Sequence, residues 1–232
     1  KRETLRLLVE SFLALGVGFA TLAVPLAFDG RWTSAVWAVE GAAIVWVGVR
    51  QGRILPRIFG MLLQPAAGLA FLVGAEKPFG ATPVLNSLYL GCVMVSVAGL
   101  FCSRYLESRR ESISDAEVVA ARLLFIWGAL WWFGSGVFEI DRHAPDGWGL
   151  HPYLLFFAGS CAAFGALWRR LDWDMARYAA LAILPLMALT VFVQFGVPYG
   201  QRHPFANHAW LGWALAFGVH LWLLRLHEGR DG

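Results

Sequence analysis

The sequence predicts an all-α integral membrane protein of about eight transmembrane helices, arranged as two parallel four-helix repeats. Of its 232 residues, 58% are hydrophobic and only 15% are charged, whereas a soluble domain carries roughly 25% charged residues. Apolar runs of about 20 residues, the length that spans a bilayer as a helix, recur along the whole chain. One polar motif also occurs twice, about 120 residues apart, which indicates an internal repeat.

The repeated motif reads Pro-aromatic-Gly, then Pro-x-x-Asn-x-x-aromatic-Leu-Gly, and it stands where a polar loop passes into an apolar run. Its two copies are Pro78-Phe79-Gly80 through Pro83 and Asn86 to Tyr89-Leu90-Gly91, and Pro198-Tyr199-Gly200 through Pro204 and Asn207 to Trp210-Leu211-Gly212. We therefore expect two units, residues 1–115 and 116–232. Because each contains an even number of spans, both copies keep the same orientation in the membrane.

The apolar runs predict the individual spans. They cover roughly 5–28, 33–50, 54–74, 84–103, 116–138, 150–168, 176–197 and 208–226. The longest connection, about 104–115, is too short for a soluble domain. Ser114 and Glu117 have the spacing of a capping box that opens the fifth span. Pro65 and Pro185 are expected to kink their spans.

The distribution of basic residues predicts the orientation. Fifteen Lys and Arg residues fall at the termini and in connections on one side, against four on the other. Lys and Arg remain preferentially in the cytoplasm, so both termini are expected there and the two repeated motifs outside. The basic residues occur in short clusters between apolar runs, which argues against a nucleic-acid partner.

Glu40 is the leading candidate for chemistry. It lies about 10 Å below the outer end of its span, at 1.5 Å per residue, where a carboxylate costs on the order of 2.5–3.5 kcal/mol. Such residues usually face a bundle interior or a wet cavity. Glu40 is interpreted either as a proton- or cation-handling group or as a buried carboxylate that bonds to a neighbouring helix.

The remaining candidate polar residues have strong structural explanations. Asn86 and Asn207 follow a proline by three residues and suit helix caps, although two symmetry-related amides could also line a vestibule. Gln64, Gln194 and His220 lie inside apolar runs, where interhelical hydrogen bonding explains most polar side chains.

A third group of polar residues lies in the predicted outer loops. It comprises Glu139, Asp141, Arg142, His143, Asp146, His151, His203 and His208. Histidines and carboxylates together suggest acid–base or metal chemistry, but no metal-binding or nucleophile motif is present. Cys92, Cys102 and Cys161 lie in apolar runs and are interpreted as small buried residues. We therefore expect no catalytic residue, metal or cofactor.

A family resemblance is carried by three segments of the second span and its flanks. They are Asp29-Gly30-Arg31-Trp32-Thr33, Trp37-Ala38-Val39-Glu40-Gly41 and Trp46-Val47-Gly48-Val49-Arg50-Gln51. The chain resembles the bacterial predicted membrane proteins grouped as domain of unknown function 2339, most clearly over about residues 12–100. The resemblance implies a bacterial inner-membrane location and suggests that the chain is a fragment of a longer protein. It supplies no activity and no catalytic residues.

These observations leave three function classes open. The first is transport or translocation of a small or lipid-linked envelope solute, with Glu40 and Gln64 beside the path. The alternative is a non-catalytic membrane scaffold or assembly subunit. An enzyme that modifies lipids or glycans at the outer face is less favoured. The expected partners are membrane lipids, with other membrane subunits or the rest of a longer chain as further candidates.

Overall fold

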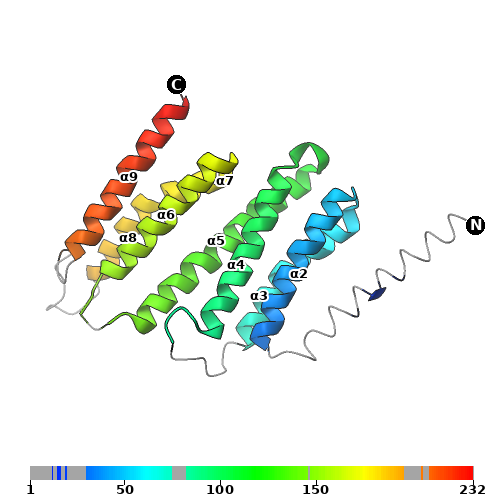
Figure 1. Ribbon diagram of the computed structural model, residues 1–232, viewed down its shortest axis with the longest axis horizontal. Coiled ribbons are helices and arrows are strands. Elements are labelled where there is room, and N and C mark those ends of the chain that lie inside the picture. The colour runs from blue at the N-terminus through cyan, green and yellow to red at the C-terminus, as the bar shows by residue number, and fades with distance from the viewer. Residues whose placement is uncertain are drawn as a thin grey trace, which may run out of the picture. The chain divides into compact units, whose positions relative to one another are not determined.

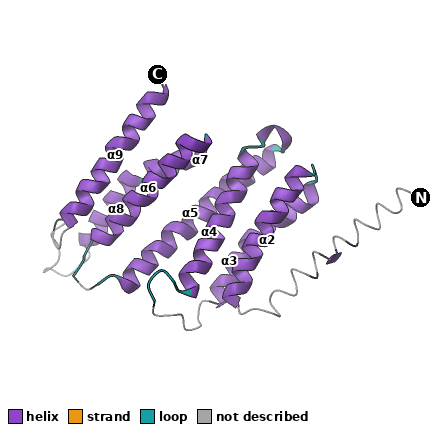
Figure 2. Ribbon diagram, in the orientation of Figure 1, coloured by secondary structure: helices purple, strands orange, loops and turns teal. Residues whose placement is uncertain are grey.

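The computed structural model describes residues 30–74, 82–145, 147–195 and 209–231, together with positions 12, 15, 16, 19 and 205. In this part of the chain the ordered elements are helices joined by short turns, without a β-strand (Figure 2). They are α2 (Gly30–Arg50), α3 (Ile54–Gly74), α4 (Ser87–Glu107), the 3₁₀ turn η1 (Arg110–Ser112), α5 (Asp115–His143), α6 (His151–Leu171), α7 (Asp174–Leu181), α8 (Ile183–Phe195) and α9 (Ala209–Asp231). The all-helical prediction is confirmed for the described residues.

Six spans of the described chain are long and apolar enough to cross a membrane. They are Ile54–Val73, Ser87–Glu107, Asp115–His143, His151–Leu171, Asp174–Val193 and Ala209–Glu228. The helix α2, whose side chains are described from Thr33 onward, is not among the six. The predicted span at 5–28 lies almost entirely outside the described residues, so the count of eight spans stays a prediction.

The chain divides into two compact units, residues 1–132 (unit 1) and 133–232 (unit 2), with the boundary inside α5. Within unit 1, α2 packs against α3 and α4. Within unit 2, α6 packs against α7, α8 and α9 (Figure 1). The predicted boundary at 115/116 falls at the first residue of α5, and the two-repeat organisation stays a prediction.

The helix α3 shows how residues are distributed in unit 1. Its buried face carries Arg57, Gly60, Gln64 and Gly68 together with the apolar Leu63, Ala67 and Phe71. Its exposed face carries large apolar side chains, namely Ile54, Leu55, Ile58, Phe59, Leu62, Leu69, Leu72 and Val73. A water-soluble surface helix has charged and polar residues on its exposed face instead. A bilayer solvates the exposed face of α3, because lipid tails are as apolar as these side chains.

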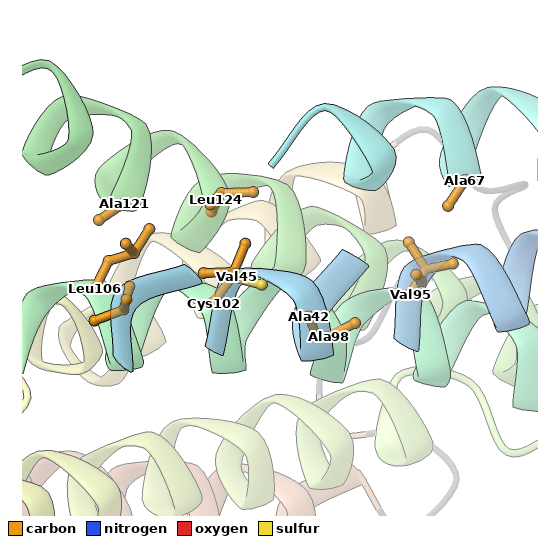
Figure 3. Close-up of a cluster of buried hydrophobic side chains, with 11 residues drawn as sticks. Ala42, Val45, Ala67, Val95, Ala98, Cys102, Leu106, Ala121 and Leu124 are labelled. Atoms are coloured by element: carbon orange, nitrogen blue, oxygen red, sulfur yellow. The ribbon is translucent and has the colours of Figure 1, made fainter. Parts of the chain in front are cut away.

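The core of unit 1 consists of small and medium-sized side chains. Ala42 and Val45 of α2 meet Val95, Ala98, Cys102 and Leu106 of α4, and Ala67 of α3 and Ala121 and Leu124 of α5 complete the cluster (Figure 3). Small residues let helix backbones approach closely, which is how membrane helices gain packing energy. In unit 2 the ring of Phe133 lies 6.1–6.2 Å from the rings of Phe156, Phe157 and Phe164.

Local sequence signals explain several helix boundaries. The helix α4 begins at Ser87, three residues later than predicted, because the Asn86 side chain caps it. The predicted span 176–197 corresponds to α7 and α8, which are interrupted at Ala182 but together provide one of the six spans. Pro185 has no N–H to offer the Leu181 carbonyl, and its ring crowds that carbonyl, which accounts for the break. Pro65 lies inside α3, which continues through it.

Candidate functional site

The two central helices of unit 1 cross at glycines. A Cβ atom added to Gly60 would lie 2.6 Å from the Gly41 carbonyl oxygen, and one added to Gly41 would lie 2.8 Å from the Gly60 carbonyl oxygen. Gly48 is just as close to α3, since its Cβ position is 2.8 Å from Arg57 Cγ. The backbones of α2 and α3 are therefore in direct contact at this level.

Gln64 joins the same crossing with a hydrogen bond. Its side chain is fully buried, and its Nε2 donates to the Ala38 carbonyl oxygen at 2.9 Å. The same Nε2 lies 2.9 Å from the Cβ position of Gly41, so only a glycine leaves room for the amide. Gln64 Oε1 is enclosed and accepts no hydrogen bond in the described part of the chain. This arrangement agrees with the structural interpretation of Gln64 as an interhelical hydrogen-bonding residue.

Glu40 lies at the edge of this crossing. The buried stripe of α2 contains Ala38, Gly41, Ala42 and Val45, whereas Val39 on the other side is 48% exposed. Glu40 is half-buried between the two, and its Oε2 atom is shielded from solvent. The structure thus brings Glu40 and Gln64 to one level of one crossing, with the amide facing into unit 1 and the carboxylate at its flank.

Asn86 is a helix cap. Its Oδ1 accepts the backbone N–H of Tyr89 at 2.8 Å, and its Nδ2 donates to the Thr82 carbonyl oxygen at 3.3 Å. The side chain is buried, and the preceding turn places Val84 at a positive φ of 63°. These contacts favour the structural interpretation of Asn86 over a vestibule-lining role.

The other candidate residues are not gathered at this crossing. Asn207 lies outside the described residues, and for Gln194 only the backbone is described, within α8. His220 is in unit 2, on the stripe of α9 that also holds the buried Trp213, Ala216 and Leu223. Gly165 of α6 lies against Leu223, so this stripe faces α6.

A buried ion pair that the sequence analysis did not identify stands near one end of unit 1. Arg57 Nε lies 3.1 Å from Glu117 Oε1, and both side chains are buried. The arginine also donates to the carbonyl oxygens of Arg53 and Ser112. Glu117 Oε2 accepts both the N–H and the hydroxyl of Ser114 at 2.9 Å, so the carboxylate forms its half of the predicted capping box, whereas the hydroxyl donates to the carboxylate. The Ser114–Glu117 spacing gave the only sequence signal for this cluster.

A second acidic cluster stands at the end of α5 in unit 2. Glu139 Oε1 lies 3.1 Å from His143 Nδ1, and the phenol of Tyr153 donates to Asp141 Oδ1 at 3.5 Å. His151 lies beside Trp148 and Gly212. The described residues contain no group of three or more His, Cys, Asp or Glu side chains that could hold a metal ion. Asp146, His203 and His208 lie outside the described residues, so the predicted outer-loop cluster is described only in part.

Glu117 and Glu139 enclose a long apolar segment of α5. Glu117 and Glu139 are 22 residues apart on this helix, or about 33 Å at 1.5 Å per residue. The hydrocarbon core of a bilayer is about 30 Å thick. Between them α5 carries a single charged residue, Arg122. The segment of α5 between the two carboxylates is therefore long and apolar enough to cross a membrane.

Comparison with known proteins identifies a family for the chain but no activity. A family model described as "Predicted membrane protein (DUF2339)" matches residues 1–231. No curated protein and no solved structure matches the chain.

Proposed function

Because the chain belongs to the DUF2339 family of predicted membrane proteins, we propose that it acts as a non-catalytic membrane scaffold or assembly subunit. The observation that carries this proposal is the crossing of α2 and α3 at Gly41 and Gly60. Backbone contact at this point leaves no space for even one methyl group. A solute path between these two helices would have to separate them.

The polar groups of unit 1 support the same function. Gln64 bonds to the α2 backbone, Arg57 pairs with Glu117, and Ser96 Oγ donates to the Gly128 carbonyl oxygen at 2.8 Å. Each of these side chains joins one helix to another. A group that receives a substrate must instead exchange its partner for the substrate, and breaking a buried ion pair costs about 3–5 kcal/mol.

Transport or translocation of a small or lipid-linked envelope solute is the second candidate. Glu40 favours it, because an ionisable group within an apolar helix usually serves an ion or substrate pathway. A path would have to follow the flank of α2 on which Glu40 lies, since the α2–α3 crossing is closed. This route makes Glu40 the residue that distinguishes the two functions.

We also propose that the membrane region comprises eight spans in two parallel repeats. The helix α6 begins and ends 121 residues after α2, and α7 begins 120 residues after α3. Gly52 and Asp172, 120 residues apart, both adopt a positive φ, in the turns that follow α2 and α6 respectively. The crossing at Gly41 also has a counterpart at Cys161, whose thiol contacts the Ala179 carbonyl oxygen at 3.5 Å.

Cysteine accessibility separates scaffold from transport without knowledge of a substrate. The three native cysteines are buried and would be replaced by alanine. Glu40→Cys is then compared in membranes with Val39→Cys, on the exposed surface, and with Arg110→Cys in the connection before α5. A charged, membrane-impermeant methanethiosulfonate is added from each side. The reagent attacks a solvated thiolate, so its rate reports water beside each position.

If the protein is a scaffold, Glu40→Cys should react as slowly as Val39→Cys, because neither of these two positions holds water to ionise the thiol. Both should react about a hundredfold more slowly than Arg110→Cys. Rapid labelling of Glu40→Cys from either side, with Val39→Cys still slow, would reject the scaffold and support a path. Thermal stability gives an independent readout. On the scaffold account Glu40→Gln is nearly silent and Glu40→Ala mildly destabilising.

A further inference from the structure

The turn between α2 and α3 presents an exposed arginine on an aromatic ring. The Arg50 guanidinium carbon lies 5.0 Å from the centroid of the Trp46 ring, one helical turn earlier. Arg50 is exposed and Trp46 is 38% exposed, so the stacked pair lies on the surface of unit 1 and not in its core. Stacking on tryptophan limits the rotamers of the guanidinium and leaves its N–H edge available to a further partner.

The charge around this turn is positive. The sequence from Gly41 to Ala75 contains Arg50, Arg53 and Arg57 but no Asp or Glu. Arg57 points inward and is compensated by Glu117. Arg50 is thus the exposed positive charge of this turn.

Large apolar side chains adjoin these charges. The first turn of α3 carries Ile54 and Leu55, which are 48% and 76% exposed. Leu55 begins the exposed apolar face of α3, which continues through Ile58, Phe59 and Leu62. Cationic side chains, a tryptophan and a lipid-exposed apolar face therefore meet at one level, as expected where headgroups meet acyl chains.

We propose that this turn binds the headgroup phosphate of an anionic phospholipid. The guanidinium of Arg50 presents parallel N–H donors that match two phosphate oxygens. The exposed side chains of Leu55 and Phe59 contact the acyl chains. The bound molecule is a lipid rather than free phosphate, because the apolar half of the site requires a hydrocarbon partner.

The corresponding turn of unit 2 provides a natural comparison. There the Arg177 guanidinium carbon lies 5.5 Å from the centroid of the Tyr178 ring. However, Asp172 and Asp174 occupy the same α6–α7 turn and are exposed. Arg169 and Arg170 at the end of α6 are exposed as well. Asp172 and Asp174 stand between these arginines and Arg177 in the sequence and oppose a phosphate, so the Arg177–Tyr178 pair is a weaker site than Arg50 on Trp46.

Native mass spectrometry of the full chain tests this proposal. The detergent-solubilised protein is titrated with phosphatidylglycerol and, separately, with phosphatidylcholine. Variants Arg50→Gln and Arg50→Lys are compared with Arg110→Gln, which removes an exposed arginine elsewhere, and with Arg177→Gln. Inorganic phosphate, added at up to the total lipid concentration, serves as the competitor that lacks acyl chains.

The wild-type protein should retain phosphatidylglycerol in preference to phosphatidylcholine. Arg50→Gln should weaken phosphatidylglycerol binding about fivefold, as expected for one arginine at an anionic surface, and Arg50→Lys should weaken it less. Arg110→Gln and Arg177→Gln should stay within about twofold of wild type, and phosphate should not displace the lipid. Unchanged binding in Arg50→Gln would overturn the proposal, as would equal losses in all the glutamine variants or displacement by phosphate.

Arg50 also stands in the last turn of α2, where a positive charge stabilises the helix dipole. Thermal unfolding in phosphatidylcholine alone isolates that structural role. Arg50→Gln should lower the melting temperature by the same amount with or without phosphatidylglycerol if the residue acts only on the helix. A larger difference between Arg50→Gln and wild type in the presence of phosphatidylglycerol is the result that the lipid site predicts.

Discussion

Replacing Gly60 with alanine should destabilise the protein, although alanine is the better helix former. The added Cβ would lie 2.6 Å from the Gly41 carbonyl oxygen, 2.8 Å from Val45 Cγ2 and 2.9 Å from the Val45 backbone nitrogen. Ordinary van der Waals contact begins at 3.4 Å, so α2 and α3 must move apart by up to 0.8 Å. Two of the three opposing atoms are backbone atoms, which cannot rotate away.

The net effect follows from two opposing magnitudes. The helix propensity of alanine contributes up to about 1 kcal/mol in favour of the variant, whereas overpacking of a tight core costs typically 1–3 kcal/mol. Separation of the helices also strains the Gln64 hydrogen bond to Ala38. We expect Gly60→Ala to be about 1–2 kcal/mol less stable, which lowers the melting temperature by roughly 2–8 °C in a chain of this size.

A thiol-reactive fluorophore can follow this unfolding, because Cys92, Cys102 and Cys161 are all buried and become reactive only when the helices separate. Gly159→Ala is the matched control, since nothing lies within 4 Å of its Cβ position. It should be neutral or slightly stabilising. If Gly60→Ala melts at or above the wild-type temperature, α2 and α3 do not cross at these glycines.

Three further substitutions test other contacts by the same unfolding assay. Arg57→Met should lower the free energy of unfolding by about 3–5 kcal/mol, because it leaves Glu117 charged and buried. The double variant Arg57→Met/Glu117→Leu should recover most of this stability. If the double variant is as unstable as the single one, the two residues are not paired. Asn86→Ala should cost about 1 kcal/mol and Asn86→Asp much less, since aspartate also caps α4; equal effects would show that the cap is unimportant. Gln64→Leu should change the stability by less than about 1 kcal/mol, because it removes the enclosed Oε1 along with the hydrogen bond. Gln64→Ala should lower the stability by at least about 2 kcal/mol, because it leaves a cavity.

Features that depend on neighbouring residues were predictable from the sequence. The runs of apolar residues indicated the described helices, the Ser114–Glu117 spacing indicated the contact of the Glu117 carboxylate with Ser114, and Asn86 was identified as a helix cap although the predicted span began at residue 84. These contacts join residues three or four positions apart, so the local sequence determines them. Pro185 likewise indicated the interruption between α7 and α8, although a kink was expected rather than two helices.

Contacts between distant residues could not be predicted in the same way. Gly41 and Gly60 are two of 25 glycines, and their meeting depends on the relative rotation of α2 and α3. Arg57 appeared only as one of many basic residues that set the orientation, because its partner Glu117 is 60 positions away. Gln64 and Glu40 were both identified as polar residues within spans, but their positions inside and at the edge of the crossing depend on helix packing.

The sidedness of cysteine labelling tests the central claim most directly, namely that the helices form a membrane-spanning bundle with its basic end in the cytoplasm. Arg109→Cys lies in the connection before α5, and Thr82→Cys lies in the turn before α4; both side chains are exposed. In intact cells a membrane-impermeant maleimide should label Thr82→Cys and should reach Arg109→Cys only after the membrane is opened. Labelling of Arg109→Cys alone would invert the orientation, and labelling of both positions in intact cells would contradict a membrane-spanning α4.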